Sequence, residues 1–137
     1  MNQAMKTPWH LWVVGGVTLI WNAFGCYIYT MAMTRNPAIM ADAPPEMVAA
    51  LDAAPAWSNG AWALGVWGGL AGSALLLFRN RWAFTALAVS VIGLIGTTIY
   101  ETMWDAPVDR AQQLTIWAVA LFLLWYAWGM RKNGVLR

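Results

Sequence analysis

The chain has 137 residues, of which 61% are hydrophobic and only 10% are charged. Soluble domains carry about 25% charged residues, so this composition excludes an ordinary soluble domain and indicates a membrane protein. The net charge is only +2, and we expect no nucleic-acid partner. The sequence has a single cysteine, which excludes an intrachain disulfide. We expect one transmembrane domain over residues 1–137.

The first apolar segment runs from Leu11 to Thr34 and contains no charged residue. As a helix it is long enough to cross a hydrocarbon core of roughly 30 Å. Its small and polar residues recur at steps of three and four, and these are Gly15, Thr18, Asn22, Cys26 and Tyr29. We predict a retained span over about residues 10–34, with this narrow face packed against a partner helix.

The longest connection follows, from Arg35 to about Ala54. Pro44-Pro45-Glu46 is typical of a helix start, and an apolar stripe comes after it at Met47, Val48, Leu51 and Ala54. We predict a short amphipathic helix that rests on the outer membrane interface or caps the bundle. An ordinary ordered loop is the alternative.

Three further apolar segments predict spans over about residues 56–78, 82–103 and 108–130. Only Arg79-Asn80-Arg81 joins the first two of these, which makes them antiparallel neighbours. Before the last span, Asp105 and Pro107 are predicted to form the helix start. The expected fold is therefore all-α, an up-down bundle of four transmembrane helices.

Small residues follow one face of the second span at every fourth position: Ala61, Gly65, Gly69 and Ser73. The third span has a comparable stripe at Ser90, Gly93, Thr97 and Tyr100. Such series let helix backbones approach closely. We predict that Gly65, Gly69, Ser73 and Gly93 pack helices within the chain, with a homodimer seam as the alternative.

The charges predict the orientation. Six of the eight basic residues lie before the first span, between the second and third, or after the fourth: Lys6, Arg79, Arg81, Arg131, Lys132 and Arg137. The other connections hold Arg35, Arg110 and all six acids, which are Asp42, Glu46, Asp52, Glu101, Asp105 and Asp109. Because short cytoplasmic loops are enriched in Lys and Arg, both termini are predicted to be cytoplasmic.

Several polar residues are candidates for function. Asn22 falls near the bilayer midplane, where its amide either contacts a ligand or forms an interhelical hydrogen bond. Glu101 at an outer helix end could bind a cation or polar solute, or be a solvated interfacial charge. The residues that could line a solute path are Asn22, Tyr29, Thr97, Tyr100, Glu101 and Gln113. The only histidine, His10, is either a metal or pigment ligand or a plain interfacial residue.

The sequence lacks the sets of residues that catalysis would require. One cysteine and one histidine cannot provide the paired thiols of a membrane oxidoreductase or the four ligands of a diheme cytochrome. The sequence has no Gly-rich phosphate loop, Ser/His/Asp set or Cys/His cluster. We therefore predict no enzyme, no metal and no cofactor. The first span also lacks the acidic residue of small multidrug exporters, and no Pro-Gln pair of a SWEET-type half-transporter occurs.

Several short motifs carry a family resemblance: Trp21-Asn22, Pro55-Ala56-Trp57, the segment from Gly68 to Leu77, and Arg79-Asn80-Arg81-Trp82-Ala83. Over roughly residues 11–100 the chain resembles a family of small four-helix bacterial inner-membrane proteins often labelled sugar-transporter-like. The resemblance implies a bacterial inner-membrane location and a transporter-like activity, and it assigns no site residues.

Two functions fit these observations. The first is a non-enzymatic accessory or interaction protein that holds a lipophilic ligand, because ionisable groups are scarce in the spans and Trp21, Trp67 and Trp117 lie deep in them. The alternative is a transporter-like protein for a small, sugar-like solute that acts as an oligomer. The predicted partners are the lipid bilayer and either a homo-oligomer or a larger membrane complex.

Overall fold

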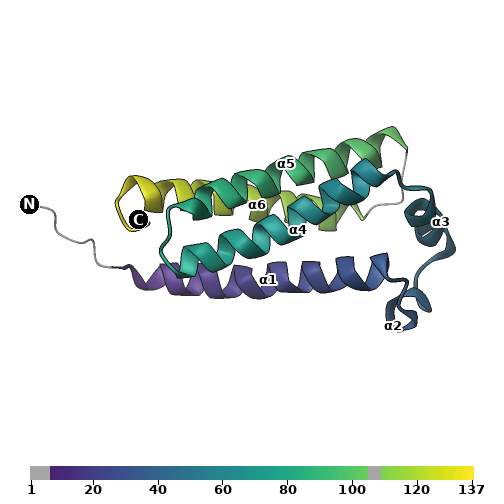
Figure 1. Cartoon of the computed structure of the whole chain (residues 1–137), viewed down its shortest axis with the longest axis horizontal. Coiled ribbons are helices and arrows are strands. Elements are labelled where there is room, and N and C mark those ends of the chain that lie inside the picture. Colours follow the sequence, from purple (N-terminus) through teal and green to yellow (C-terminus); the bar gives the residue numbers. More distant parts are fainter. Residues whose placement is uncertain (1–6, 105–108) are drawn as a thin grey trace, which may run out of the picture.

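The computed structural model describes residues 7–104 and 109–137 (Figure 1). Its helices are α1 (Trp9–Met33), α2 (Pro37–Met40), α3 (Pro45–Ala53), α4 (Ala56–Leu77), α5 (Trp82–Met103) and α6 (Arg110–Lys132). Helices α1, α4, α5 and α6 are long and apolar enough to cross a membrane, so the prediction of four spanning helices is confirmed. Their bounds fall within two residues of the predicted ones.

Proline or aspartate precedes three of the spanning helices. Pro8 and Pro55 precede α1 and α4, where the missing proline N–H leaves no helical bond unmade. Helix α6 begins after Asp109, whose Oδ1 accepts hydrogen bonds from the N–H groups of Ala111 and Gln112 at 3.1 and 3.4 Å. The prediction that Asp105 caps this helix was wrong, since a nearer aspartate does so; Asp105 and Pro107 themselves lie outside the described residues.

Two helices end on an arginine in the left-handed region. Arg35 after α1 has a φ of 52° and Arg79 after α4 a φ of 55°. Glycine is favoured at this position because a Cβ costs roughly 1–2 kcal/mol there. In both cases the arginine side chain has a partner. Arg35 forms an ion pair with Asp52 at 2.9 Å, and Nη1 of Arg79 donates to the Thr7 hydroxyl at 2.7 Å.

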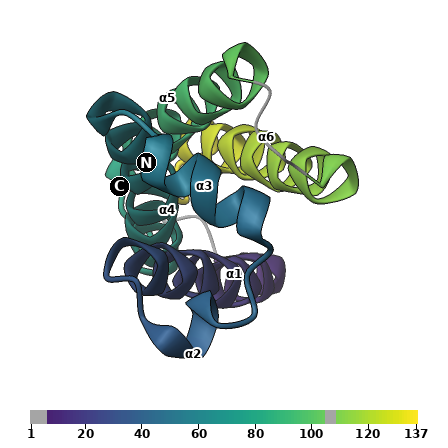
Figure 2. The same ribbon diagram turned by 90° about the vertical axis from the view of Figure 1, so that its right-hand side faces the viewer.

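The four long helices form an open arc. The extensive interfaces are those of α4 with α5, α1 with α4, and α5 with α6. Seen from one end, α4 stands between α1 and α5, and α6 lies across from α4, beside α5 and on the side of α5 that faces α1 (Figure 2). Among the described residues, α1 and α6 share no interface of comparable extent. The bundle therefore has one open side, between its first and last spanning helices.

The connection after α1 contains the predicted amphipathic helix as α3, together with a shorter helix, α2, that was not predicted. Helix α2 starts because Asn36 Oδ1 accepts from the N–H of Ala38 and Pro37 follows the cap. Helix α3 is held at the end of the bundle by the Tyr100 hydroxyl, which donates to the Ala50 carbonyl at 2.9 Å. Its role is therefore that of a cap.

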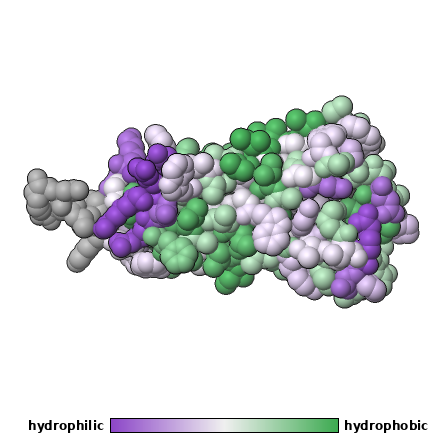
Figure 3. Space-filling model, viewed as in Figure 1, coloured by the Kyte–Doolittle hydropathy of each residue, from purple (hydrophilic) through white to green (hydrophobic). Residues whose placement is uncertain are grey.

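Hydrophilic residues gather at the two ends of the molecule, with a hydrophobic band between them (Figure 3). One end holds the α4–α5 turn and the residues after α6, with Arg79, Arg81, Arg131, Lys132 and Arg137; we call it the basic end. The other carries α2, α3 and the start of α6, with Asp42, Glu46, Asp52, Glu101 and Asp109; we call it the acidic end. The predicted orientation, with both termini cytoplasmic, depends on this separation of basic from acidic residues.

The residues after α6 fold back onto the basic end, which was not predicted. Gly134, with a φ of 82°, reverses the chain so that Val135 and Leu136 join a buried cluster with Leu11 and Leu123. The backbone of Arg137 then pairs with the α4–α5 turn. Its N–H donates to the carbonyl of Arg79 at 2.8 Å, and its carbonyl accepts from the N–H of Arg81 at 3.1 Å.

Candidate ligand-binding crevice

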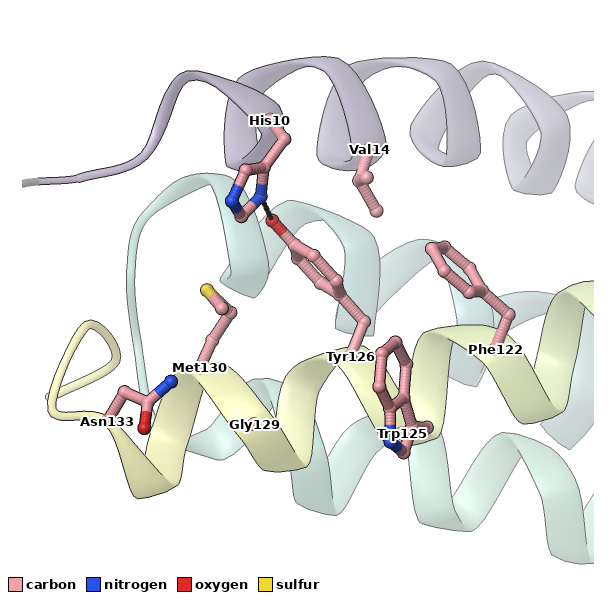
Figure 4. Close-up of a pocket in the computed structure, with 8 residues that line it drawn as sticks. All are labelled: His10, Val14, Phe122, Trp125, Tyr126, Gly129, Met130 and Asn133. Carbon is pink, nitrogen blue, oxygen red and sulfur yellow. Dashed lines mark hydrogen bonds between the residues drawn. The ribbon is translucent and has the colours of Figure 1, made fainter.

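A cavity of about 410 Å³ lies between α1 and α6 near the basic end (Figure 4). Its size falls in the range of roughly 300–1,000 Å³ that is typical of small-molecule sites. Helix α1 and helix α6 with the residue after it supply the lining, which consists of His10, Val14, Phe122, Trp125, Tyr126, Gly129, Met130 and Asn133. We call this cavity the α1–α6 crevice.

One face of α6 forms most of the crevice wall. Phe122, Tyr126, Gly129 and Asn133 follow one another at steps of three and four, which is the spacing of a single helix face. Gly129 leaves this face hollow, because a Cβ added there would meet nothing within 4 Å. The crevice therefore exists where a residue without a side chain interrupts a row of large ones.

A hydrogen bond crosses the crevice near the basic end. His10 Nδ1 on α1 bonds to the hydroxyl of Tyr126 on α6, and Figure 4 shows the two side chains pointing toward each other. Their rings meet edge to face, with centroids 5.6 Å apart. Tyr126 is only 8% exposed. His10 thus has a defined partner, and it links two helices that share no extensive interface.

The crevice opens toward the surface of the spanning region. Trp125 is 70% exposed and Phe122 43% exposed, and both belong to the lining. Exposed apolar side chains of a membrane-spanning helix face the lipid, because the hydrocarbon core contains no water to shield them from. A molecule dissolved in the bilayer could enter the crevice from the side.

Asn22 lies in the interface between α1 and α4. Its Nδ2 donates to the Ser73 hydroxyl and to the Thr18 carbonyl, each at 2.9 Å. The Ser73 hydroxyl in turn donates to the hydroxyl of Thr18 at 3.3 Å, and Ser73 is fully buried. The amide therefore takes part in an interhelical hydrogen-bond network, which is the packing alternative for this residue.

The other predicted path residues are distributed over several interfaces. Tyr29 packs edge to face on Trp62, again between α1 and α4, with ring centroids 5.0 Å apart. Thr97 bonds within its own helix, to the Gly93 carbonyl at 3.1 Å, and Tyr100 binds α3.

Glu101 and Gln113 meet between α5 and α6, where Gln113 Nε2 donates to Glu101 Oε2 at 2.6 Å. Arg110 Nη1 also donates to Gln113 Oε1, at 2.6 Å. Within residues 7–104 and 109–137, the six path candidates thus do not converge on one cavity, and none of them lines the crevice.

The small residues predicted to pack helices all lie between helices of this chain. A Cβ on Gly93 would be 2.5 Å from the Ala61 carbonyl oxygen and the Gly65 nitrogen, and one on Gly69 would be 2.4 Å from Asn22 Oδ1. Gly65 faces the α5 backbone at 3.8 Å, an ordinary contact distance. The helix backbones therefore approach each other closely at the α4–α5 and α1–α4 interfaces, which we call the α4–α5 and α1–α4 seams.

The crevice was not found from the sequence. Its signal is the glycine at 129 among the aromatic residues 122, 125 and 126, but that pattern alone does not say which helix faces it. No metal site accompanies it, since no group of three His, Cys, Asp or Glu side chains in the described part of the chain could hold an ion.

In comparisons with protein-family models, curated proteins and solved structures, no match to this chain was found. The family resemblance in the sequence therefore stays a prediction. The arguments for function rest on the geometry of the crevice and on the charges around it.

Proposed function

We propose that this integral membrane protein works without catalytic chemistry and holds a lipophilic molecule in the α1–α6 crevice. The observation that carries the proposal is the cavity of about 410 Å³, lined mainly by apolar and aromatic side chains on two membrane-spanning helices. Ligand sites are commonly apolar hollows with a few fixed polar groups. Here the polar groups are His10, Tyr126 and Asn133.

The arrangement favours an amphiphile with a defined orientation. His10 and Asn133 lie toward the basic end, whereas Val14 and Phe122 lie deeper along the spans (Figure 4). An apolar chain beside Val14 and Phe122 would replace lipid contacts with protein contacts. A polar group beside His10 and Asn133 would keep its hydrogen bonds. The predicted bacterial inner membrane would supply such molecules.

Solute transport, the alternative function, has less support. A path for a sugar-like solute needs polar side chains that converge on one cavity. Five of the six candidates are spread over the α1–α4, α3–α5 and α5–α6 contacts, and Thr97 bonds within α5. Participation in a homo-oligomer or a larger complex is compatible with ligand holding and is part of the proposal.

Native mass spectrometry of the protein, extracted gently from its own membrane, tests the proposal. We expect a bound lipophilic mass on the wild type that is at least tenfold depleted in Gly129→Leu, because the added side chain extends into the crevice. Gly16→Leu is the matched control: Gly16 also lies on a spanning helix with nothing within 4 Å of an added Cβ, but it does not line the crevice. Equal retention in both variants would reject the proposal.

A further inference from the structure

We propose that the occupant of the crevice is an anionic phospholipid, with an acyl chain between α1 and α6 and its phosphate at the basic end. This inference rests on the proposed function and adds the ligand class. It is carried by the charges around the crevice mouth and by the position of one lysine on α6.

The charge at the crevice mouth is of one sign. Among the described residues, every aspartate and glutamate lies at the acidic end, and the basic end carries five cations: Arg79, Arg81, Arg131, Lys132 and Arg137. Clustered cations at a membrane surface attract anionic headgroups, with each Lys or Arg contributing roughly 1 kcal/mol. A neutral or zwitterionic headgroup would gain much less from this field.

Most of these arginines already have partners away from the crevice. Arg79 donates to Thr7, the Arg81 guanidinium lies 5.7 Å from the centre of the Trp82 ring, and that of Arg131 lies 5.9 Å from the ring of Phe84 on α5. These contacts direct the three side chains toward other elements. They leave Lys132 and Arg137, and of these two only Lys132 lies on α6, the helix that forms most of the crevice wall.

Lys132 lies beside the crevice face of α6. It follows Gly129 by three residues and Trp125 by seven, so it is on the same side of the helix as both. The residue is exposed, and in the part of the chain that the structure describes its ammonium group makes no ion pair. Its long, flexible stem can bring the charge to a phosphate at the membrane surface.

Two neutral groups complete the headgroup site. Asn133 lines the crevice next to Lys132, and its side-chain NH₂ supplies two donors. When the Tyr126 hydroxyl donates to Nδ1 of His10, the proton of the neutral imidazole is on Nε2, which is then a donor as well. A phosphate can accept hydrogen bonds from the Lys132 ammonium, the Asn133 amide and His10 Nε2. The lining nearer the middle of the membrane is apolar, which suits the acyl chain.

The test compares two lipids that share acyl chains, phosphatidylglycerol and phosphatidylcholine, titrated separately onto the full-length, delipidated protein in detergent. Binding is measured by native mass spectrometry. We expect phosphatidylglycerol to bind at least fivefold more tightly. Lys132→Gln should weaken its binding roughly fivefold and leave phosphatidylcholine unchanged, as expected for the loss of one cation at a headgroup.

Arg81→Gln is the matched control, since it removes a charge from the same end at a residue that stacks on Trp82. Its effect on phosphatidylglycerol should be less than twofold. Equal losses in Lys132→Gln and Arg81→Gln would mean diffuse attraction and would overturn the headgroup site. Lys132 is exposed, so its substitution leaves the packing of the bundle intact.

Gly129→Leu separates this inference from the proposed function. Suppose that the wild type binds both lipids equally and that Gly129→Leu loses both. The crevice then holds an acyl chain without discriminating between headgroup charges, and only the inference fails. If Gly129→Leu binds both lipids as the wild type does, the crevice is not the binding site and both proposals fail.

Discussion

Helix α1 faces two spanning helices, α4 and α6, and it meets them in opposite ways. Against α4 it presents small and polar residues, of which Gly15, Thr18 and Cys26 are buried, and the Cys26 thiol donates to the Val66 carbonyl at 3.3 Å. Toward α6 it presents Val14 and His10 across a cavity. One face is a continuous seam, and the other encloses a cavity with a hydrogen bond between His10 and Tyr126 across it.

The difference shows what holds helices together in lipid. Acyl chains are as apolar as leucine, so exposed Val, Leu and Phe gain little by pairing with each other. Helix association in lipid therefore depends on close backbone approach and on hydrogen bonds, and both need small or polar residues at the interface. The α4–α5 and α1–α4 seams have them at 69, 73 and 93, whereas the α6 face at 122, 125 and 126 has bulky rings.

The largest effect is expected for Gly93→Ala. The added methyl would lie 2.5 Å from backbone atoms of Ala61 and Gly65, which cannot rotate away, so α4 and α5 must separate. Overpacking of this kind costs about 1–3 kcal/mol. Thermal melting in detergent should show a clear drop relative to Gly60→Ala, where the methyl meets nothing within 4 Å. Equal melting temperatures would mean that the seam yields easily.

Asn22→Leu should come next, with a loss of about 1 kcal/mol, because it removes the bond that joins α1 to Ser73 on α4. A double-mutant cycle with Ser73→Ala should give a coupling energy of about 0.6 kcal/mol, and no more than about 1.7. Thr115→Val is the control, since that hydroxyl bonds only within its own helix. A coupling of zero between Asn22 and Ser73 would argue that the amide serves another purpose.

Tyr126→Phe tests how much the hydrogen bond between α1 and α6 contributes to stability. It removes the hydroxyl that bonds to His10 and keeps the ring that lines the crevice. We expect a loss of about 0.5–1 kcal/mol, the usual net contribution of one hydrogen bond, measured by thermal melting. Tyr27→Phe, at a 50% exposed residue of α1, should have no measurable effect. A loss as large as that of Gly93→Ala would contradict the view that this side is loosely held.

Gly129→Ala should change stability least. The methyl enters open space, and alanine is the better helix former, by up to about 1 kcal/mol in water. The melting temperature should stay the same or rise slightly. A marked fall would show that α1 and α6 approach each other more closely in the membrane, and the crevice would then be narrower than described.

The sequence predicted the spanning helices well because their signals are local. Uncharged length, Pro8 and Pro55 before helices, and the Arg79-Asn80-Arg81 turn all act within a few residues of the structure they determine. The small-residue face of α1 was also readable, since steps of three and four depend only on the helix itself. The cap of α6 was misassigned because Asp105 and Asp109 are both plausible caps.

The crevice could not be predicted for a physical reason. It depends on how α6 is rotated about its axis and how far it stands from α1, and both depend on packing against other helices, above all α5. The pairing of His10 with Tyr126 spans 116 positions of sequence and has no local signature. The fold-back of Val135 and Leu136 likewise depends on a buried cluster assembled from several helices.

The pairing of Arg137 with the α4–α5 turn has a consequence for biosynthesis. Helices α4 and α5 share the most extensive interface and are joined by the four residues 78–81, so they are suited to enter the membrane together as a hairpin. Their turn then exposes the Arg79 carbonyl and the Arg81 N–H, whose partner residue is made 56 positions after Arg81. At about 5–20 residues per second, that partner emerges seconds later. The two hydrogen bonds of Arg137 with the turn therefore form only after α6 has been synthesised.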